Sequence, residues 1–229
     1  MVGVPWEGGC TIGGYSSTTE GPKAVRSASI RYTGFLPDYN LDCFDYLNVA
    51  DSGDIATQNG NYDFTFKSIR ERIGKLADAK IIPITIGGDH GIAYPIISEI
   101  AKRYPKKVGV LHFDAHLDNY SHFGDDELSR CSPFYRVYND PNMDPTKIAH
   151  IGIRGPRNHR EEYNNAVKYG ATVIRAIDVH EDGWKASISK ALEVVSKDTE
   201  YIYITVCADS LDAANMPQAP PGHGWSDFL

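Results

Sequence analysis

The chain has 229 residues, of which 41% are hydrophobic and 23% charged, and its formal net charge is −7 at pH 7. This length and composition fit one soluble α/β domain and exclude a disordered chain. The negative charge disfavours nucleic acid as a partner and is compatible with a small cationic substrate. No apolar run approaches the roughly 20 residues that a transmembrane helix needs, so we expect no membrane association.

Residues 1–6 lack the basic and apolar regions of a signal peptide. The four cysteines are scattered without CxxC spacing, which argues against a zinc knuckle or a disulfide framework. We therefore expect a protein of the reducing cytoplasm. Residues 225–229 are typical of the start of a helix, so we expect one domain over residues 1–229 that is shortened at both ends.

Apolar periodicity predicts strands and helices in alternation along the chain. We expect helices over residues 63–79, 92–103, 158–168 and 184–197, and strands over residues 81–86, 108–113, 147–153, 171–175 and 201–206. The segment from about 119 to 145 is interpreted as a long polar loop. Short β-branched runs that alternate with helices are typical of a parallel sheet covered on both faces.

Acidic residues and histidines gather directly after three of the predicted strands. Gly87-Gly-Asp-His90 follows strand 81–86, and Asp114-Ala-His-Leu-Asp118 follows strand 108–113. A third group, Cys207-Ala-Asp-Ser-Leu-Asp212, follows the last strand. Because parallel sheets bind ligands beyond the carboxyl ends of their strands, these groups indicate one shared site.

Asp114, His116 and Asp118 occupy every second position, so in an extended chain their side chains would project the same way. Carboxylates and imidazole are ligands of divalent metals, and the pattern predicts half of a metal site. The alternative is that they are polar residues at a strand end that pair with lysines. Burying three such groups would be costly unless each has a partner.

His90 follows two glycines that permit a tight turn close to a ligand, which favours a metal ligand over an incidental histidine. Asp89 has two open interpretations, a residue that orients a ligand from outside or the N-cap of the next helix. Asp212 is likewise predicted to orient a metal ligand without contacting the metal itself.

In an extended segment, the side chains of residues 207 and 209 project to the same side. A dinuclear site needs bridging ligands that hold two metals about 3.5–4 Å apart, and Asp114 and residue 207 are the natural bridges. Residue 207 is a cysteine, whose softer thiolate favours zinc over manganese. The alternative is that Cys207 is a small buried residue and that one metal position is lost.

Together these motifs resemble the ureohydrolase family of arginase, agmatinase, guanidinobutyrase and formiminoglutamase. Further matches extend the likeness over essentially the whole chain: Gly3-Val-Pro5, Gly21-Pro22 with Arg26, Asp51-Ser-Gly-Asp54 and Ile151-Gly-Ile-Arg154. The resemblance implies a three-layer α/β/α sandwich with a central, mainly parallel sheet. It also implies a homo-oligomer, usually a trimer or a hexamer.

The resemblance further implies a centre with two divalent metals per subunit, usually manganese and sometimes nickel. His90, Asp114 and Asp118 would hold the first metal, and Asp114, His116 and Asp209 the second. Cys207 as a ligand would make zinc possible. A metal-bridging hydroxide would attack the carbon of a guanidino compound, as in agmatinase, and Asp118 would pass the proton to the departing amine. The products would be urea and an amine.

This chain departs from the family pattern at several positions. Cys207 stands where the family has its second bridging carboxylate, and Ala213 replaces the proline after Asp212. Arg130 stands where a proton-relaying histidine precedes the Ser-Pro-Phe element, and His122 nearby is assigned to that catalytic role. The loop after the last motif is shortened to residues 220–224. These departures leave open a non-catalytic subunit that pairs with an active paralogue.

The predicted loop 119–145 is expected to carry substrate specificity. Asn119 and Ser121 are candidates to bind the substrate tail, and so is the cluster Asp125-Asp126-Glu127, unless that cluster is an ordinary solvated loop. A related fold that deacetylates lysine or polyamines with one zinc is a third alternative. The motifs Gly87-Gly-Asp-His90 and Asp114-Ala-His-Leu-Asp118 fit ureohydrolases better.

Overall fold

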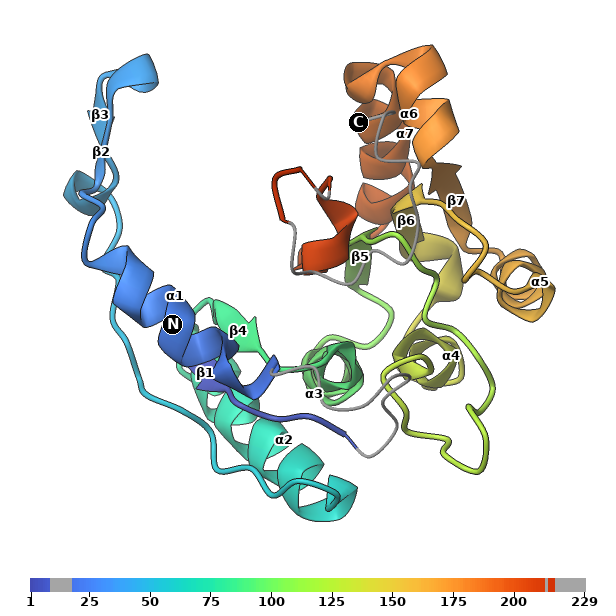
Figure 1. The fold of residues 1–229 in the computed structure, drawn as a ribbon, viewed down its shortest axis with the longest axis horizontal. Coiled ribbons are helices and arrows are strands. Elements are labelled where there is room, and N and C mark those ends of the chain that lie inside the picture. The colour runs from blue at the N-terminus through green and yellow to red at the C-terminus, as the bar shows by residue number, and fades with distance from the viewer. Residues whose placement is uncertain (9–17, 213, 217–229) are drawn as a thin grey trace. The chain divides into compact units, whose positions relative to one another are not determined.

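A computed structural model describes residues 1–8, 18–212 and 214–216, which form two compact units, Met1–Pro95 and Ile96–Leu229 (Figure 1). The first unit contains two small two-stranded sheets, and the second a four-stranded parallel sheet. The departures at Ala213 and residues 220–224 lie outside the described residues, and so does the helix start expected at residues 225–229.

The first unit is built around β1 (Val2–Val4), which pairs in parallel with β4 (Thr85–Gly87). The described part of this unit includes the helices α1 (Gly21–Ser29) and α2 (Tyr62–Asp78). The short strands β2 (Phe35–Leu36) and β3 (Leu41–Asp42) form an antiparallel hairpin, seen beyond one end of α1 in Figure 1.

Helix α2 begins one residue before the predicted helix 63–79 and ends one residue before it. The Asn61 side chain accepts a hydrogen bond from the Phe64 N–H at 3.0 Å and caps the first turn. Phe66, Ile69 and Ile73 recur at helical spacing and are buried. The prediction of this helix is confirmed, because its apolar stripe lies in the core of the unit.

The predicted strand 81–86 is largely wrong, because β4 covers only Thr85–Gly87. Lys80 has a positive φ of 57°, which interrupts an extended chain at the start of the run. Pro83 lacks the N–H that a strand ladder requires. Ile82 is 87% exposed, so this apolar run does not mark a buried strand.

The second unit is organised on a parallel sheet with the strand order β7-β6-β5-β8. Each of these strands lies within one residue of a predicted strand, which confirms four of the five strand predictions. Their bounds are Val108–Phe113 for β5, Ile148–Ile153 for β6, Thr172–Arg175 for β7 and Tyr201–Val206 for β8.

One face of this sheet is covered by α6 (Ala176–Asp182) and α7 (Trp184–Ser196), which lie side by side in Figure 1. Leu111, Ile151 and Ile174 form the core there with residues of α7. Gly109 permits this close approach, because a side chain at this position would collide with the carbonyl oxygen of Val195.

The opposite face presents His112 and His150, which are partners in the register of β5 and β6. Both rings contact α4 (Pro133–Tyr138), and α5 (Arg160–Tyr169) packs near the ends of β6 and β7. Helices therefore cover both faces, as predicted. The edge strand β8 is the exception, because Ile204 and Val206 are exposed among the described residues.

Three helices were missed by the sequence analysis, namely α1 and the two shorter helices α4 and α6. Helix α4 lies inside the predicted loop 119–145, where Pro133 occupies the first turn. Helix α6 follows β7 directly, and the Asp178 carboxylate accepts a hydrogen bond from the Arg175 N–H at its start. Helices of six and seven residues are too short to show a clear apolar period.

Helix α3 (Ala93–Arg103) confirms the predicted helix 92–103, with Pro95 in its first turn. The predictions of helices 158–168 and 184–197 are confirmed by α5 and α7. Across the described ranges, the helices lack the combination of length and apolar character that spanning a membrane requires.

Candidate metal centre

The candidate site forms where β5 and β8 end side by side in the second unit. Their pairing continues past the strands, because the Cys207 N–H donates to the Phe113 carbonyl at 2.9 Å. Asp114 follows β5 immediately, and Asp209 lies in a single turn of 3-10 helix (Ala208–Ser210) after β8. This juxtaposition confirms the expectation that the second and third sequence groups meet at one edge of the sheet.

Three potential ligands converge there: Asp114, His116 and Asp209. Their ligand atoms all lie within 4.8 Å of one another. The Nδ1 atom of His116 lies 3.1 Å from Oδ2 of Asp209 and 3.5 Å from Oδ1 of Asp114. Both carboxylates are buried, so two negative charges face one imidazole in a region of limited solvent access.

The ligands converge through a bend in the chain and not through strand alternation. Strand β5 ends at Phe113, and Oδ1 of Asp114 accepts a hydrogen bond from the His116 N–H at 2.7 Å. Asp118 has a positive φ of 46°, which is uncommon for a residue other than glycine. The expectation that residues 114, 116 and 118 share one face of an extended chain is therefore wrong.

Arg154 holds the two ligand segments together from the end of β6. Its guanidinium group donates to the backbone carbonyls of Asp209 at 2.9 Å and Leu211 at 3.3 Å. The backbone N–H of Arg154 donates to the Ala115 carbonyl at 2.9 Å. The match at Ile151-Gly-Ile-Arg154 thus has a physical role, because one side chain fixes Asp209 beside Asp114.

The electrostatics of the cluster favour a cation. Burial alone lowers the pKa of His116, but hydrogen bonds to Asp114 and Asp209 outweigh burial and raise that pKa to about 10. The charge of Asp118 acts in the same direction. The imidazole therefore retains a proton as counter-ion to the two carboxylates. Two carboxylates and one imidazole fit a divalent cation, which would displace that proton on binding.

Glu162 is a buried carboxyl group in the same unit, with 2% of its surface exposed. Burial raises its pKa to about 8, and the charge of Asp118 adds to the shift. A hydrogen bond from the His159 N–H to its Oε2 at 3.0 Å acts in the opposite direction. The carboxyl group is therefore largely protonated at neutral pH.

We expect Glu162→Gln to be more stable than the parent protein above pH 8. The folded-state pKa lies above the ordinary value of 4.5, so its stabilisation is present at low pH and lost as pH rises through 8. Glutamine keeps the acceptor for His159 without the charge. The gain in melting temperature, roughly 2–4 °C per kcal/mol, is expected to grow from pH 5 to pH 9 in calorimetry. Exposed Glu193→Gln is the control, and a gain that does not depend on pH would contradict the assignment.

The ligand candidates of the first unit lie around its 3-10 turn His90–Ile92, of which His90 is the first residue. The Asp89 carboxylate accepts hydrogen bonds from the Gly91 N–H at 2.9 Å and the Gly8 N–H at 2.5 Å. Asp89 is thus the N-cap of this turn. His90 belongs to a different unit from Asp114, and its role as a ligand stays a prediction.

The predicted residues of the 119–145 segment have different environments. Asn119 is fully buried, and its Nδ2 donates to the Tyr138 hydroxyl at 3.3 Å. The Ser121 hydroxyl donates to Oε1 of Glu161 at 2.9 Å, and His122 is exposed. The Asn119 side chain therefore lies in the core of the unit and not on its surface.

The remaining sequence candidates lie near β8. Cys207 is half-buried, and Cys43, Cys131 and Cys207 are not joined in disulfides. The Asp212 carboxylate accepts a hydrogen bond from the Ala214 N–H at 2.6 Å. Within the described part of the chain, neither Cys207 nor Asp118 is a member of the three-ligand group.

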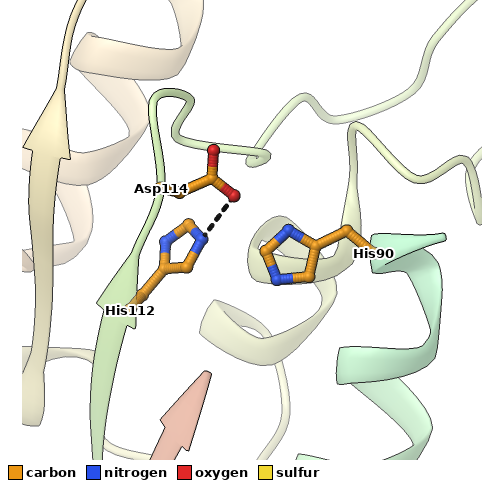
Figure 2. A group of neighbouring side chains, drawn as sticks. All are labelled: His90, His112 and Asp114. Atoms are coloured by element: carbon orange, nitrogen blue, oxygen red, sulfur yellow. Dashed lines mark hydrogen bonds and ion pairs between the residues drawn. The ribbon is translucent and has the colours of Figure 1, made fainter. Parts of the chain in front are cut away.

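The sequence analysis missed His112, which directly contacts the site. Figure 2 shows its ring beside Asp114 at the end of β5, with Nε2 lying 3.0 Å from Oδ2 of the carboxylate. The sequence contained one signal for this contact. Residue 112 lies two positions before Asp114, and side chains two positions apart on a strand point to the same face. A histidine within an otherwise apolar strand marks a group that needs a buried partner.

Comparison with known proteins gives consistent matches along the chain. A family model described as Arginase family matches residues 1–225. Guanidinobutyrase of Pseudomonas aeruginosa is 30% identical over 219 residues, which are 95% of this chain and 66% of that protein. Human mitochondrial guanidino acid hydrolase is 32% identical over 219 residues, which are 95% of this chain and 60% of that protein.

A solved structure of proclavaminate amidino hydrolase from Streptomyces clavuligerus is similar to this chain with a TM-score of 0.81 and 27% identity. The match covers 93% of this chain and 69% of that one. The likeness confirms the predicted α/β sandwich with a mainly parallel sheet. The chain spans about two thirds or less of the length of the two curated relatives.

Proposed function

We propose that this chain, which belongs to the arginase family, hydrolyses a small guanidino compound to urea and an amine. The observation that carries the proposal is the group Asp114, His116 and Asp209 at the meeting ends of β5 and β8. Two carboxylates and one imidazole, which suit a divalent metal, converge there, and Arg154 holds the backbone of Asp209.

A divalent cation bound by these residues supplies a Lewis acid and lowers the pKa of a nearby water. Manganese is the first candidate, because carboxylates predominate, and nickel or zinc are the alternatives. His90, Asp118 and Cys207 are proposed to complete a second cation position. Asp118 is also proposed to hold the proton of the attacking water and to pass it to the departing amine.

The substrate class follows from the relatives, and the formal net charge of −7 is compatible with a cationic guanidinium group. The relatives are named for guanidinobutyrate and guanidino acids, so a guanidino group on a short tail is the proposed substrate, with agmatine as the first example. Ser121 is proposed to meet the tail and His122 to relay a proton, while the buried Asn119 is proposed to hold their loop from the core.

We also propose that the chain assembles with itself in the cytoplasm, as a trimer or a hexamer. Large apolar side chains are exposed along residues 30–49 and on β8, which is typical of surfaces that another chain covers. A paralogous ureohydrolase is the alternative partner, and Cys207 is the observation that favours it.

The test is metal content by elemental analysis after purification with manganese, nickel or zinc, followed by urea release from agmatine and guanidinobutyrate. The proposal predicts about two equivalents per chain and urea formation that depends on the metal. Cys43→Ser, a cysteine change in the first unit outside the ligand groups, is the control, and it should keep the metal content and urea release of the parent chain. A folded protein with neither metal nor urea release would overturn the proposal in favour of a non-catalytic subunit.

A further inference from the structure

A line of buried hydrogen bonds runs from Asp114 into the core of the second unit. The His112 Nε2 atom lies 3.0 Å from Oδ2 of Asp114, and its Nδ1 lies 2.7 Å from Nδ1 of His150. The Nε2 atom of His150 lies 2.6 Å from the Tyr138 hydroxyl, which receives a hydrogen bond from Asn119. All five residues are buried, so bulk water does not compete for these contacts.

One protonation pattern satisfies every contact in this line. The Asp114 carboxylate accepts, so His112 donates from Nε2 and, as a neutral imidazole, accepts at Nδ1. His150 therefore donates from Nδ1 and accepts at Nε2 from the Tyr138 hydroxyl. Asn119 donates from its amide to Tyr138. Every donor points towards Asp114, so the tautomer of each imidazole is set by its neighbours.

Packing fixes the two imidazole rings in this arrangement. The ring of Phe134 stacks on His112 with centroids 4.1 Å apart and meets His150 edge-on at 5.0 Å. Phe134 belongs to the Ser-Pro-Phe element noted in the sequence and begins α4 together with Pro133. The same short helix supplies Tyr138, so α4 positions both the aromatic support and the hydroxyl donor.

We infer that His112, His150 and Tyr138 are positioning residues that orient the Asp114 carboxylate before a cation binds. Oδ2 of Asp114 is held by His112, while Oδ1 receives the His116 N–H at 2.7 Å and faces the other ligands. The relay, defined as His112, His150 and Tyr138, presents a fixed ligand in place of one free to rotate. The inference rests on the proposed function, because orienting Asp114 serves the binding of a cation.

Tyr138→Phe tests the relay from its far end, three hydrogen bonds away from Asp114. We expect the manganese dissociation constant, measured by calorimetry on the full chain, to rise about 10-fold, at the lower end of outer-shell effects. Tyr169→Phe is the matched control. Its hydroxyl donates to Asn139 at 2.9 Å and its ring packs on Tyr138, yet it lies outside the relay. Its affinity for manganese is expected to stay unchanged.

His150 allows a rescue that a merely structural role would not produce. His150→Gln retains one donor and one acceptor and is expected to keep manganese affinity close to that of the parent, whereas His150→Leu is expected to lose about 10–100-fold. Melting temperatures of the cation-free variants separate folding defects from binding defects. Folded Tyr138→Phe and His150→Leu proteins with unchanged manganese affinity would overturn the inference.

Imidazole nitrogen NMR on the cation-free protein tests the relay independently of metal and of activity. The relay predicts that His112 carries its proton on Nε2 and His150 on Nδ1. A proton on Nδ1 of His112 would overturn the inference even in a protein that hydrolyses guanidino compounds. If the predicted tautomers are found in a protein that binds no cation, the proposed function fails and the relay stands.

Discussion

Asp114→Asn is expected to abolish cation binding while leaving the chain folded. Asparagine keeps the size of the side chain but removes a buried charge that contacts both His116 and His112. Its amide group also presents donors where His112 already donates. We expect manganese affinity to fall by more than the roughly 100-fold that outer-shell changes cost. Urea release should fall at least about 10³-fold, or about 4 kcal/mol in transition-state stabilisation.

Elemental analysis and a urea assay measure these two losses on the same preparation. Asp178→Asn is the control, because it removes the same charge from an ion pair with Arg175 at the start of α6, away from the ligands. That control should retain the full metal content. An Asp114→Asn protein with undiminished metal content would show that the cation binds elsewhere.

Cys207→Asp is expected to increase manganese affinity and urea release. Residue 207 follows β8, and its N–H bonds to the residue before Asp114, so a carboxylate here would lie beside the ligand group. A carboxylate oxygen is a harder ligand than a thiolate and favours manganese over zinc. We expect the preference for manganese over zinc to shift by about 10-fold or more, equivalent to about 1.4 kcal/mol.

Competition between manganese and zinc in calorimetry measures this shift. Cys207→Asn is the matched control, because it has the size of the aspartate variant without its charge. It should lose zinc affinity without gaining manganese affinity. Equal preferences in the aspartate and asparagine variants would mean that residue 207 does not contribute to the cation position.

The sequence predicted the second unit well because its strands are short apolar runs buried on a parallel sheet. Strand ends and ligand chemistry then indicated Asp114 and His116, and the resemblance to ureohydrolases added Asp209; these three side chains converge in the structure. The same reasoning failed at residues 81–84, where an apolar run is exposed and Pro83 lacks the N–H that a strand ladder uses. Hydrophobicity predicts a strand only where the side chains are buried.

The relay could not be predicted from sequence, because it depends on strand register. His112 and His150 lie 38 positions apart and meet only because β5 and β6 pair residue 112 with residue 150. Helix α4 is too short for a periodic signal, so the position of Tyr138 was equally hidden. The left-handed backbone of Asp118 is set by the bend after β5 and has no local signature.

The proposed function depends on the claim that Asp114, His116 and Asp209 bind a divalent cation. Its most direct test is an anomalous difference map from crystals grown with manganese, recorded on both sides of the manganese absorption edge. The claim predicts a manganese peak within roughly 2.5 Å of a carboxylate oxygen of Asp114, of Nδ1 of His116 and of a carboxylate oxygen of Asp209. A map with no peak among these three side chains, from protein saturated with manganese, would contradict it.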